Sequence, residues 1–218
     1  MGGLTFDGVV FDADGTLFDT ENLMYEVWVE VGEEMNFPYP GREYLDYVGL
    51  NRAAVLALMR ERYGEGFDGA EFMVRCVERL SQRIEGEGVP LKPGVREILA
   101  FLQENNIPVG LATSTHRVRT DRRLELCGLA EYFQAVTTGD EVSKGKPDPE
   151  IYLATCKKLG LDPTRCLAVE DSKNGILSAR AAGMSVAMIP DMIPPTEALL
   201  AQVWGQFDTL TDLQNCLK

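Results

Sequence analysis

The hydrophobic and polar positions of this chain follow two patterns. Short uninterrupted apolar runs are typical of buried strands, and apolar residues repeating every three or four positions are typical of amphipathic helices. The apolar runs predict strands at 9–11, 108–112, 135–137, 166–169 and 186–189. The helical repeats predict helices at 21–35, 95–105, 118–127, 149–159 and 174–182.

Helices and strands alternate from residue 95 onward, whereas residues 42–86 carry only helical patterns. The alternation predicts a parallel sheet with helices on both faces, because parallel strands are joined by crossovers that are usually helical. We therefore expect an α/β fold. Its core comprises residues 1–18 and 89–218, and a small all-helical domain, residues 19–88, is inserted after the first strand.

Four short polar motifs lie at the ends of these elements. Taken singly, each is typical of a turn or a helix N-cap. Because parallel strands place all their carboxyl ends at one edge, where ligands bind in open α/β sheets, we expect the four motifs to converge. They are Asp12-Ala13-Asp14-Gly15-Thr16, Thr113-Ser114-Thr115, Lys144-Gly145-Lys146-Pro147-Asp148-Pro149 and Glu170-Asp171-Ser172.

The charges of these motifs do not balance, because Asp12, Asp14, Glu170 and Asp171 would share one lysine, Lys146. Two like charges about 4 Å apart repel by roughly 4 kcal/mol at an effective dielectric near 20, so a cation or a proton is needed. Magnesium prefers carboxylate oxygens and keeps water and substrate phosphate in its shell. The pattern therefore predicts magnesium-assisted phosphoryl transfer, in which one carboxylate attacks phosphorus, another transfers protons, and a lysine and a hydroxyl bind the phosphoryl oxygens.

The charge and composition of the chain limit the classes of partner that it can bind. The chain has 218 residues and a formal charge of −13, which argues against a nucleic-acid-binding face. Its apolar stretches are too short to cross a membrane, and its first residues lack a signal-peptide pattern. The five scattered cysteines are typical of small buried side chains in a reducing compartment. We expect a cytoplasmic monomer that acts on a small phosphorylated metabolite, with neither nucleic acid nor membrane as partner.

The four motifs, in this order and spacing, resemble those of the haloacid dehalogenase superfamily of phosphotransferases, over residues 9–189. Within it, the chain is similar to the beta-phosphoglucomutase-like sugar-phosphate phosphatases, which have a Rossmann-like catalytic core and a helical cap. The resemblance implies that Asp12 is the nucleophile and a metal ligand. It implies that Asp14 is the general acid/base, with its backbone carbonyl on Mg²⁺, and that Asp171 and Glu170 are metal ligands, Glu170 directly or through water.

The same resemblance implies that Thr113 and Lys146 bind the phosphoryl group. Lys144 is the rival lysine, and Lys146 is favoured because it directly precedes Pro147. Arg52, in the segment Gly49-Leu50-Asn51-Arg52, would reach the distal end of the substrate, as Arg83 would with lower rank. The remaining candidates for substrate binding are Thr16, Ser114 and Asn174.

Four interpretations of these residues can be compared. Related mutases carry a histidine ten residues after the acid/base, where this chain has Met24, so the resemblance favours a phosphatase over a sugar-phosphate mutase. A dehalogenase needs only one acid in the first motif, so the second acid, Asp14, argues for phosphoryl transfer and against dehalogenation. A non-catalytic module would have lost at least one of four residues, and all four are present: Asp12, Asp14, Lys146 and Asp171.

We expect the cap to close over the substrate about hinges at 17–20 and 86–89.

Overall fold

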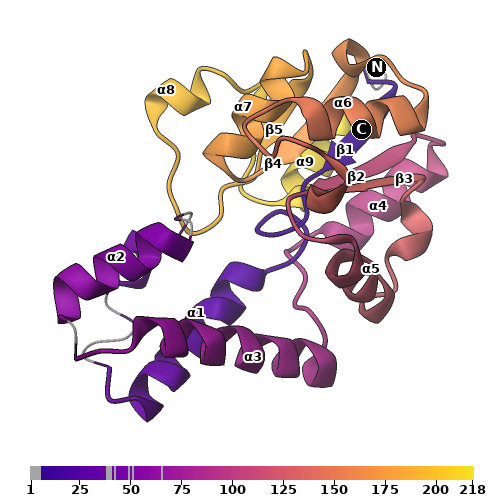
Figure 1. Cartoon of the computed structure of the whole chain (residues 1–218). Helices are drawn as coiled ribbons and strands as arrows, with labels where there is room; N and C mark the ends of the chain where they lie inside the picture. Colours follow the sequence, from indigo (N-terminus) through magenta and orange to yellow (C-terminus); the bar gives the residue numbers. More distant parts are fainter. Residues whose placement is uncertain (1–5, 38–40, 42, 49, 51, 65) are drawn as a thin grey trace. The chain divides into compact units, whose positions relative to one another are not determined.

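The computed structural model describes residues 6–37, 41, 43–48, 50, 52–64 and 66–218 (Figure 1). The chain forms two compact units. The core unit comprises Met1–Asp19 and Val89–Lys218, and the helical unit comprises Thr20–Gly88. None of the helices in the described ranges is both long and apolar enough to cross a membrane.

The core unit contains a six-stranded sheet with the order β3-β2-β1-β4-β5-β6, in which every neighbouring pair is parallel. This sheet confirms the predicted α/β fold. The strand β6 was not predicted, because two residues are too few to produce a recognisable apolar run. The strands are β1 (Gly8–Phe11), β2 (Val109–Thr113), β3 (Ala135–Thr138), β4 (Cys166–Glu170), β5 (Ser185–Met188) and β6 (Gly205–Gln206).

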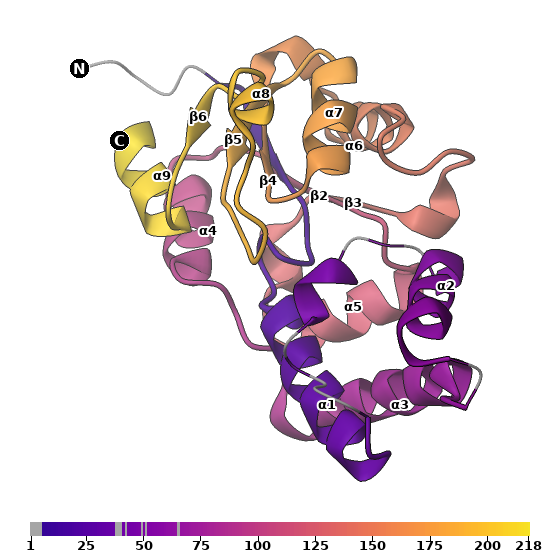
Figure 2. The ribbon, with the colours of Figure 1, turned by 90° about the vertical axis from the view of Figure 1, so that its left-hand side faces the viewer.

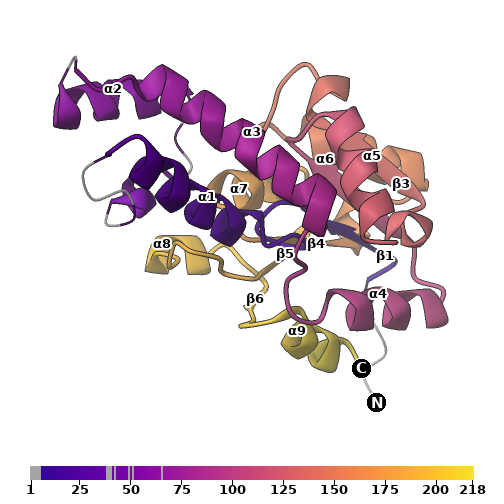
Figure 3. The same ribbon diagram turned by 90° about the horizontal axis from the view of Figure 1, so that it is seen from below.

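Helices cover both faces of this sheet. Val10, Ala112 and Ala168 point to one face, where they form a buried cluster with residues of α6 and α7. Successive side chains of a strand point to opposite faces, so Val9 and Phe11 point to the other one, on the side of α4 and α9 (Figures 2 and 3). The helices of the core unit are α4 (Val95–Glu104), α5 (Arg117–Leu126), α6 (Glu150–Leu159), α7 (Lys173–Ala181), α8 (Glu197–Leu200) and α9 (Leu210–Leu217).

The register of the central strands brings the polar motifs together. Phe11 lies opposite Leu111 of β2 and Val169 of β4. The next residue, Asp12, donates its backbone N–H to the carbonyl of Val169 over 2.9 Å. Asp12 therefore lies beside the end of β4, where Glu170 is the last residue of the strand and Asp171 follows it.

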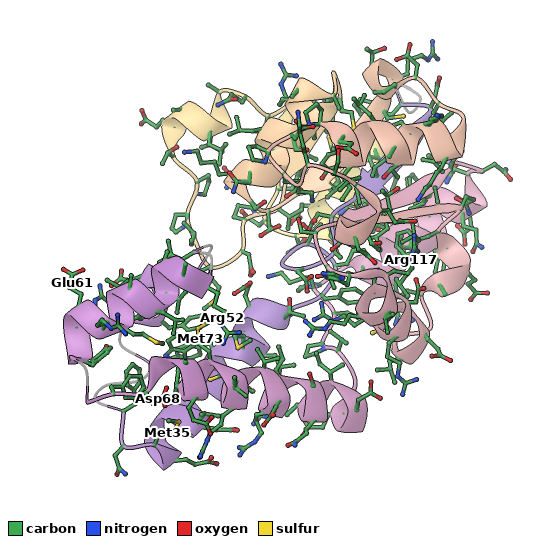
Figure 4. All side chains as sticks on the ribbon, viewed as in Figure 1. Met35, Arg52, Glu61, Asp68, Met73 and Arg117 are labelled. Carbon is green, nitrogen blue, oxygen red and sulfur yellow. The ribbon has the colours of Figure 1, made fainter. Side chains whose placement is uncertain are left out.

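In the described part of the helical unit, the regular elements are α1 (Thr20–Glu34), α2 (Arg52–Tyr63), α3 (Gly69–Glu87) and a short 3₁₀ turn at Tyr44–Asp46. Asp68, labelled in Figure 4, caps α3 by accepting a hydrogen bond from the backbone N–H of Glu71 over 3.0 Å. Aromatic rings fill the interior, with Trp28 and Phe72 edge to face at 4.7 Å between centroids. Ion pairs on the surface join α1 to α3.

Candidate active site

The predicted acids meet at the carboxyl edge of the sheet. Asp12 follows β1, Glu170 ends β4, and Asp171 comes directly after it. Each offers one carboxylate oxygen, and these three oxygens lie within 4.8 Å of one another. Asp12 and Glu170 are buried, and Asp171 is half-buried. Clustered carboxylate oxygens are the donor set that Mg²⁺ prefers, so these residues fit a magnesium ion.

Lys146 is the cation of this cluster. It lies between β3 and α6, before a cis peptide bond to Pro147. Its Nζ donates to Asp12 Oδ1, to Glu170 Oε1 over 2.6 Å and to the backbone carbonyl of Ala112 over 3.0 Å. The side chain of Lys144 is 72% exposed and lies 3.7 Å from Asp148. Of these two lysines, Lys146 is the one that contacts the acid cluster.

Both oxygens of Glu170 are occupied by donors from the protein. Oε1 accepts from Lys146 and, over 2.7 Å, from the hydroxyl of Tyr152. Oε2 accepts from the backbone N–H and the hydroxyl of Ser172. A carboxylate has about four lone-pair sites, and all are used here. A metal ion or a metal-bound water could therefore contact Glu170 only by displacing one of these donors, and both alternatives for Glu170 stay predictions.

A glycine makes room for this carboxylate. A Cβ atom on Gly175, in the first turn of α7, would overlap the carboxylate of Glu170. Any side chain at this position would displace Glu170 and, with it, the acceptor that holds Lys146.

Tyr152 is a residue of this site that the sequence did not reveal. It lies on α6, is fully buried, and places its ring 5.1 Å from Lys146 Nζ. Burial, reinforced by Glu170 and Asp12, raises the pKa of Tyr152 well above its ordinary value. The hydroxyl therefore stays protonated and remains a donor to Glu170. In the sequence, Tyr152 is only one member of the apolar stripe of a helix.

The pKa values of the clustered acids reflect their burial close to one another. Burial raises the pKa of Asp12 to about 8, with Lys146 opposing the rise and Glu170 adding to it. Burial, Glu170 and Asp12 also raise the pKa of Asp171. Burial opposes the charge of Lys146, but Asp12 and Glu170 outweigh it and raise the pKa of that ammonium group. A divalent cation at the cluster would favour the ionised carboxylates.

Asp14 points to a different set of partners from Asp12. Its Oδ2 accepts from the hydroxyl of Thr115 over 2.7 Å, and its Oδ1 pairs with the guanidinium of Arg123 on α5. Its side-chain oxygens are not among those clustered with Asp12 and Asp171. Arg123 was not predicted, because α5 carries several arginines and nothing in their spacing identifies one of them.

Thr16 and Gly15 border Asp171. Thr16 is fully buried, and its hydroxyl donates to Asp171 Oδ1 over 3.2 Å. We expected Thr16 to bind substrate, and this placement favours a role in holding Asp171. Gly15 has a φ of 83°, and a Cβ there would lie 2.5 Å from Asp171 Oδ2. Both the turn and the close approach therefore require glycine.

The positions of the remaining candidates in the core unit do not show whether they contact substrate. Thr113, at the end of β2, is buried, and its hydroxyl accepts from the backbone N–H of Thr115 over 3.1 Å. Ser114 and Asn174 are exposed in the core unit. The single histidine, His116, is 75% exposed and faces Asp140 at 3.9 Å. Contact of these residues with substrate stays a prediction.

The predicted cap residues lie in the helical unit. Arg52 is exposed at the first residue of α2 (Figure 4), whereas Gly49 and Asn51 of the same motif lie outside the described residues. Arg83 pairs with Glu26 over 2.7 Å and with Glu30. Its guanidinium therefore has a structural function in joining α3 to α1.

A model of the haloacid dehalogenase-like hydrolase family matches residues 6–183. The protein belongs to this family. This haloacid dehalogenase-like hydrolase is 36% identical over 178 residues to the phosphorylated carbohydrates phosphatase of Thermotoga maritima, covering 82% of each chain. It is 33% identical over 183 residues to hexitol phosphatase B of Escherichia coli K12, covering 83% of this chain and 82% of the relative.

Solved structures of related proteins resemble this hydrolase over nearly the whole chain. A putative beta-phosphoglucomutase from Thermotoga maritima superposes with a TM-score of 0.82 at 32% identity, covering 96% of this chain and 97% of the other. A family hydrolase from Deinococcus radiodurans, with bound phosphate and sodium, has a TM-score of 0.84 at 26% identity, covering 98% and 96%. Together these relatives confirm the resemblance inferred from the four motifs.

Proposed function

We propose that this protein is a magnesium-dependent phosphatase that hydrolyses a small sugar phosphate through an aspartyl-phosphate intermediate. The observation that carries the proposal is the cluster of Asp12, Glu170 and Asp171, in which Lys146 contacts the two buried acids, Asp12 and Glu170. Two relatives that share a third of the sequence are named for phosphatase activity on phosphorylated carbohydrates or hexitols, which supports the substrate class.

In this proposal, Asp12 is the nucleophile. Lys146 engages its Oδ1 and favours the ionised carboxylate against the effect of burial. The other oxygen of Asp12 then attacks phosphorus, and the P–O bond to the leaving group breaks. The hydroxyl of Thr113 donates to the phosphoryl oxygens as charge develops on them, and Lys146 does so by exchanging one of the three acceptors of its ammonium group for a phosphoryl oxygen.

Asp14 is the proposed general acid and base. It donates a proton to the leaving oxygen and then takes one from the water that hydrolyses the aspartyl-phosphate. The ion pair with Arg123 and the hydrogen bond from Thr115 fix the side chain. Because Thr115 and Arg123 engage both side-chain oxygens of Asp14, the carboxyl group must exchange one of these partners for the leaving oxygen of the substrate before it can transfer a proton.

Asp12 and Asp171 would hold the magnesium ion, together with the backbone carbonyl of Asp14 and with Glu170, directly or through water. The bound ion would neutralise the acids and the phosphate and so allow the two to approach. The helical unit is proposed to act as the cap. The boundaries of the two units, at residues 19–20 and 88–89, fall within both proposed hinges.

A sugar-phosphate mutase is the second candidate, favoured by the likeness to a putative beta-phosphoglucomutase at 32% identity. Met24 on α1, in place of the mutase histidine, weighs against it. The two activities differ in product. A phosphatase releases inorganic phosphate from hexose phosphates with Mg²⁺ alone, whereas a mutase interconverts isomers and needs a bisphosphate primer.

The decisive experiment measures Mg²⁺-dependent phosphate release from a panel of sugar phosphates and other phosphorylated metabolites. We expect turnover by the wild type, no turnover by Asp12→Asn because the amide cannot attack phosphorus, and unchanged turnover by Lys144→Met, whose side chain is exposed. Circular dichroism of Asp12→Asn controls for folding. Phosphate release by Asp12→Asn at the wild-type rate would contradict the assignment of the nucleophile.

A further inference from the structure

Asp191 is a buried acid for which the proposed reaction provides no role. It follows β5, and its side chain is only 7% exposed. Its Oδ1 accepts from Lys92 Nζ over 2.6 Å. Its Oδ2 is also buried and has no hydrogen-bond partner in the part of the chain that the structure describes. A buried carboxylate oxygen without a donor is costly, so this atom calls for an explanation.

The unpartnered oxygen lies beside the metal-site acid Asp171. A Cβ atom built on Gly15 would be 2.5 Å from Asp171 Oδ2 and 3.1 Å from Asp191 Oδ2. Both oxygens therefore border the same point of the Gly15 backbone. Asp191 is also one of the charges that, after burial, raise the pKa of Asp171. Two acidic oxygens in such proximity are stable only if a cation or a donor lies near both.

Lys92 fixes Asp191 in this position. The backbone N–H of Lys92 donates to the carbonyl of Leu17 over 2.9 Å, and its Nζ lies 3.7 Å from Asp19 Oδ1. The lysine side chain is itself 13% exposed. Because Oδ1 of Asp191 is engaged by Lys92, the carboxylate is oriented so that Oδ2 is presented to the side of Asp171.

We propose that Asp191 is a positioning residue of the metal site, whose Oδ2 accepts a hydrogen bond from a water bound to the ion held by Asp12 and Asp171. Magnesium usually keeps several waters, and each has protons that need acceptors. The proposal rests on the metal site of the proposed function. It explains why one oxygen of a buried carboxylate has no donor from the protein, whereas the other has a lysine.

The test is isothermal titration of the protein with Mg²⁺ alone. Outer partners of metal sites typically contribute 10-fold to 100-fold in affinity, so we expect Asp191→Asn to weaken Mg²⁺ binding at least about 10-fold. Asp208→Asn removes the same charge from an exposed position of the core unit and should bind Mg²⁺ as the wild type does. The increase in melting temperature on adding Mg²⁺ should be smaller for Asp191→Asn and normal for Asp208→Asn.

Lys92→Gln separates this role from that of a structural ion pair. If Asp191 serves only to pair with Lys92, Asp191→Asn and Lys92→Gln will lower the melting temperature alike and leave Mg²⁺ affinity at the wild-type value. That result would overturn the inference. In our account, both variants lower the melting temperature, but Lys92→Gln keeps the Asp191 carboxylate and so binds Mg²⁺ more tightly than Asp191→Asn.

Asp12→Asn distinguishes a failure of this inference from a failure of the proposed function. If Asp12→Asn loses Mg²⁺ binding and Asp191→Asn retains it fully, only the role of Asp191 is overturned. If the wild type does not bind Mg²⁺, the inference and the magnesium-dependent function are both overturned. If Mg²⁺ binding depends on Asp191 but no phosphorylated metabolite is hydrolysed, the proposed function fails and the role of Asp191 stands.

Discussion

Two regions of the molecule bring acids and bases together, and they do so in opposite ways. On the surface of the helical unit, the glutamates of α1 face Arg79 and Arg83 of α3, with Glu26 60% exposed and Arg83 22% exposed. At the carboxyl edge of the sheet, Lys146 is 6% exposed and Glu170 is fully buried. Water screens the ion pairs on the surface of the helical unit, whereas the buried charges at the edge of the sheet are screened much less.

The difference shows why only the second region is suited to chemistry. Exposed ion pairs typically contribute between 0 and about 1 kcal/mol, and their acids and bases need not balance because water solvates the excess. The cluster of Asp12, Glu170 and Asp171 has three carboxylates, and Lys146 pairs with two of them. The raised pKa values of Asp12 and Asp171 show that folding alone does not stabilise their charges. A divalent cation and a phosphoryl group restore the balance.

The largest expected effect is that of Lys146→Met. The change leaves the buried carboxylates of Asp12 and Glu170 without their cation and removes a donor to the phosphoryl group. Loss of one such donor typically lowers kcat by about 10²–10³. We expect at least that loss in phosphate release, together with a lower melting temperature that Mg²⁺ partly restores. Lys144→Met, two residues away and exposed, is the matched control, and equal loss in both variants would refute the assignment.

A smaller effect is expected from pH. The pKa of Asp12 rises from the ordinary 3.8 to about 8 on folding, so the folded protein binds more protons than the unfolded chain between these values. Stability therefore falls as pH rises through this window. We expect the melting temperature, measured in EDTA, to fall between about pH 5 and pH 8, and Asp12→Asn to fall less. A wild-type melting temperature that falls no more than that of Asp12→Asn over this pH range would contradict this assignment.

The smallest effect is expected from Arg83→Leu in the helical unit. Its partners are exposed, so the free energy of unfolding should decrease by less than about 1 kcal/mol. Because the guanidinium is engaged by Glu26 and Glu30, we expect the KM for the sugar phosphate to stay unchanged. A large increase in KM with unchanged stability would instead assign Arg83 to substrate binding, the alternative that the sequence left open.

The sequence predicted the residues whose position follows from topology. Asp12, Thr113 and Asp171 lie at strand ends, and the carboxyl ends of parallel strands necessarily share one edge. Lys146 could be chosen over Lys144 because of its neighbour Pro147. The boundaries of the strands and helices predicted between residues 9 and 35 and between 95 and 189 agree with the structure to within about two residues.

Other features depend on side-chain directions in distant elements, which periodicity does not encode. Tyr152, Arg123 and Asp191 reach the site from α6, α5 and the segment after β5, and each is inconspicuous in its local pattern. The hydroxyl of Thr16 faces Asp171 because the turn at Gly15 directs it there. The short helices α8 and α9 lie beyond the last recognised strand, where no pattern was assigned.

The most direct test of the central claim is to identify the phosphorylated residue in a rapidly quenched reaction by peptide mass spectrometry. The protein is mixed with Mg²⁺ and the best substrate of the panel, quenched in acid and digested. We predict one added phosphoryl group on the peptide that contains Asp12, and none without Mg²⁺ or in Asp12→Asn. A phosphoryl group on another residue, or wild-type label that persists in Asp12→Asn, would contradict the account.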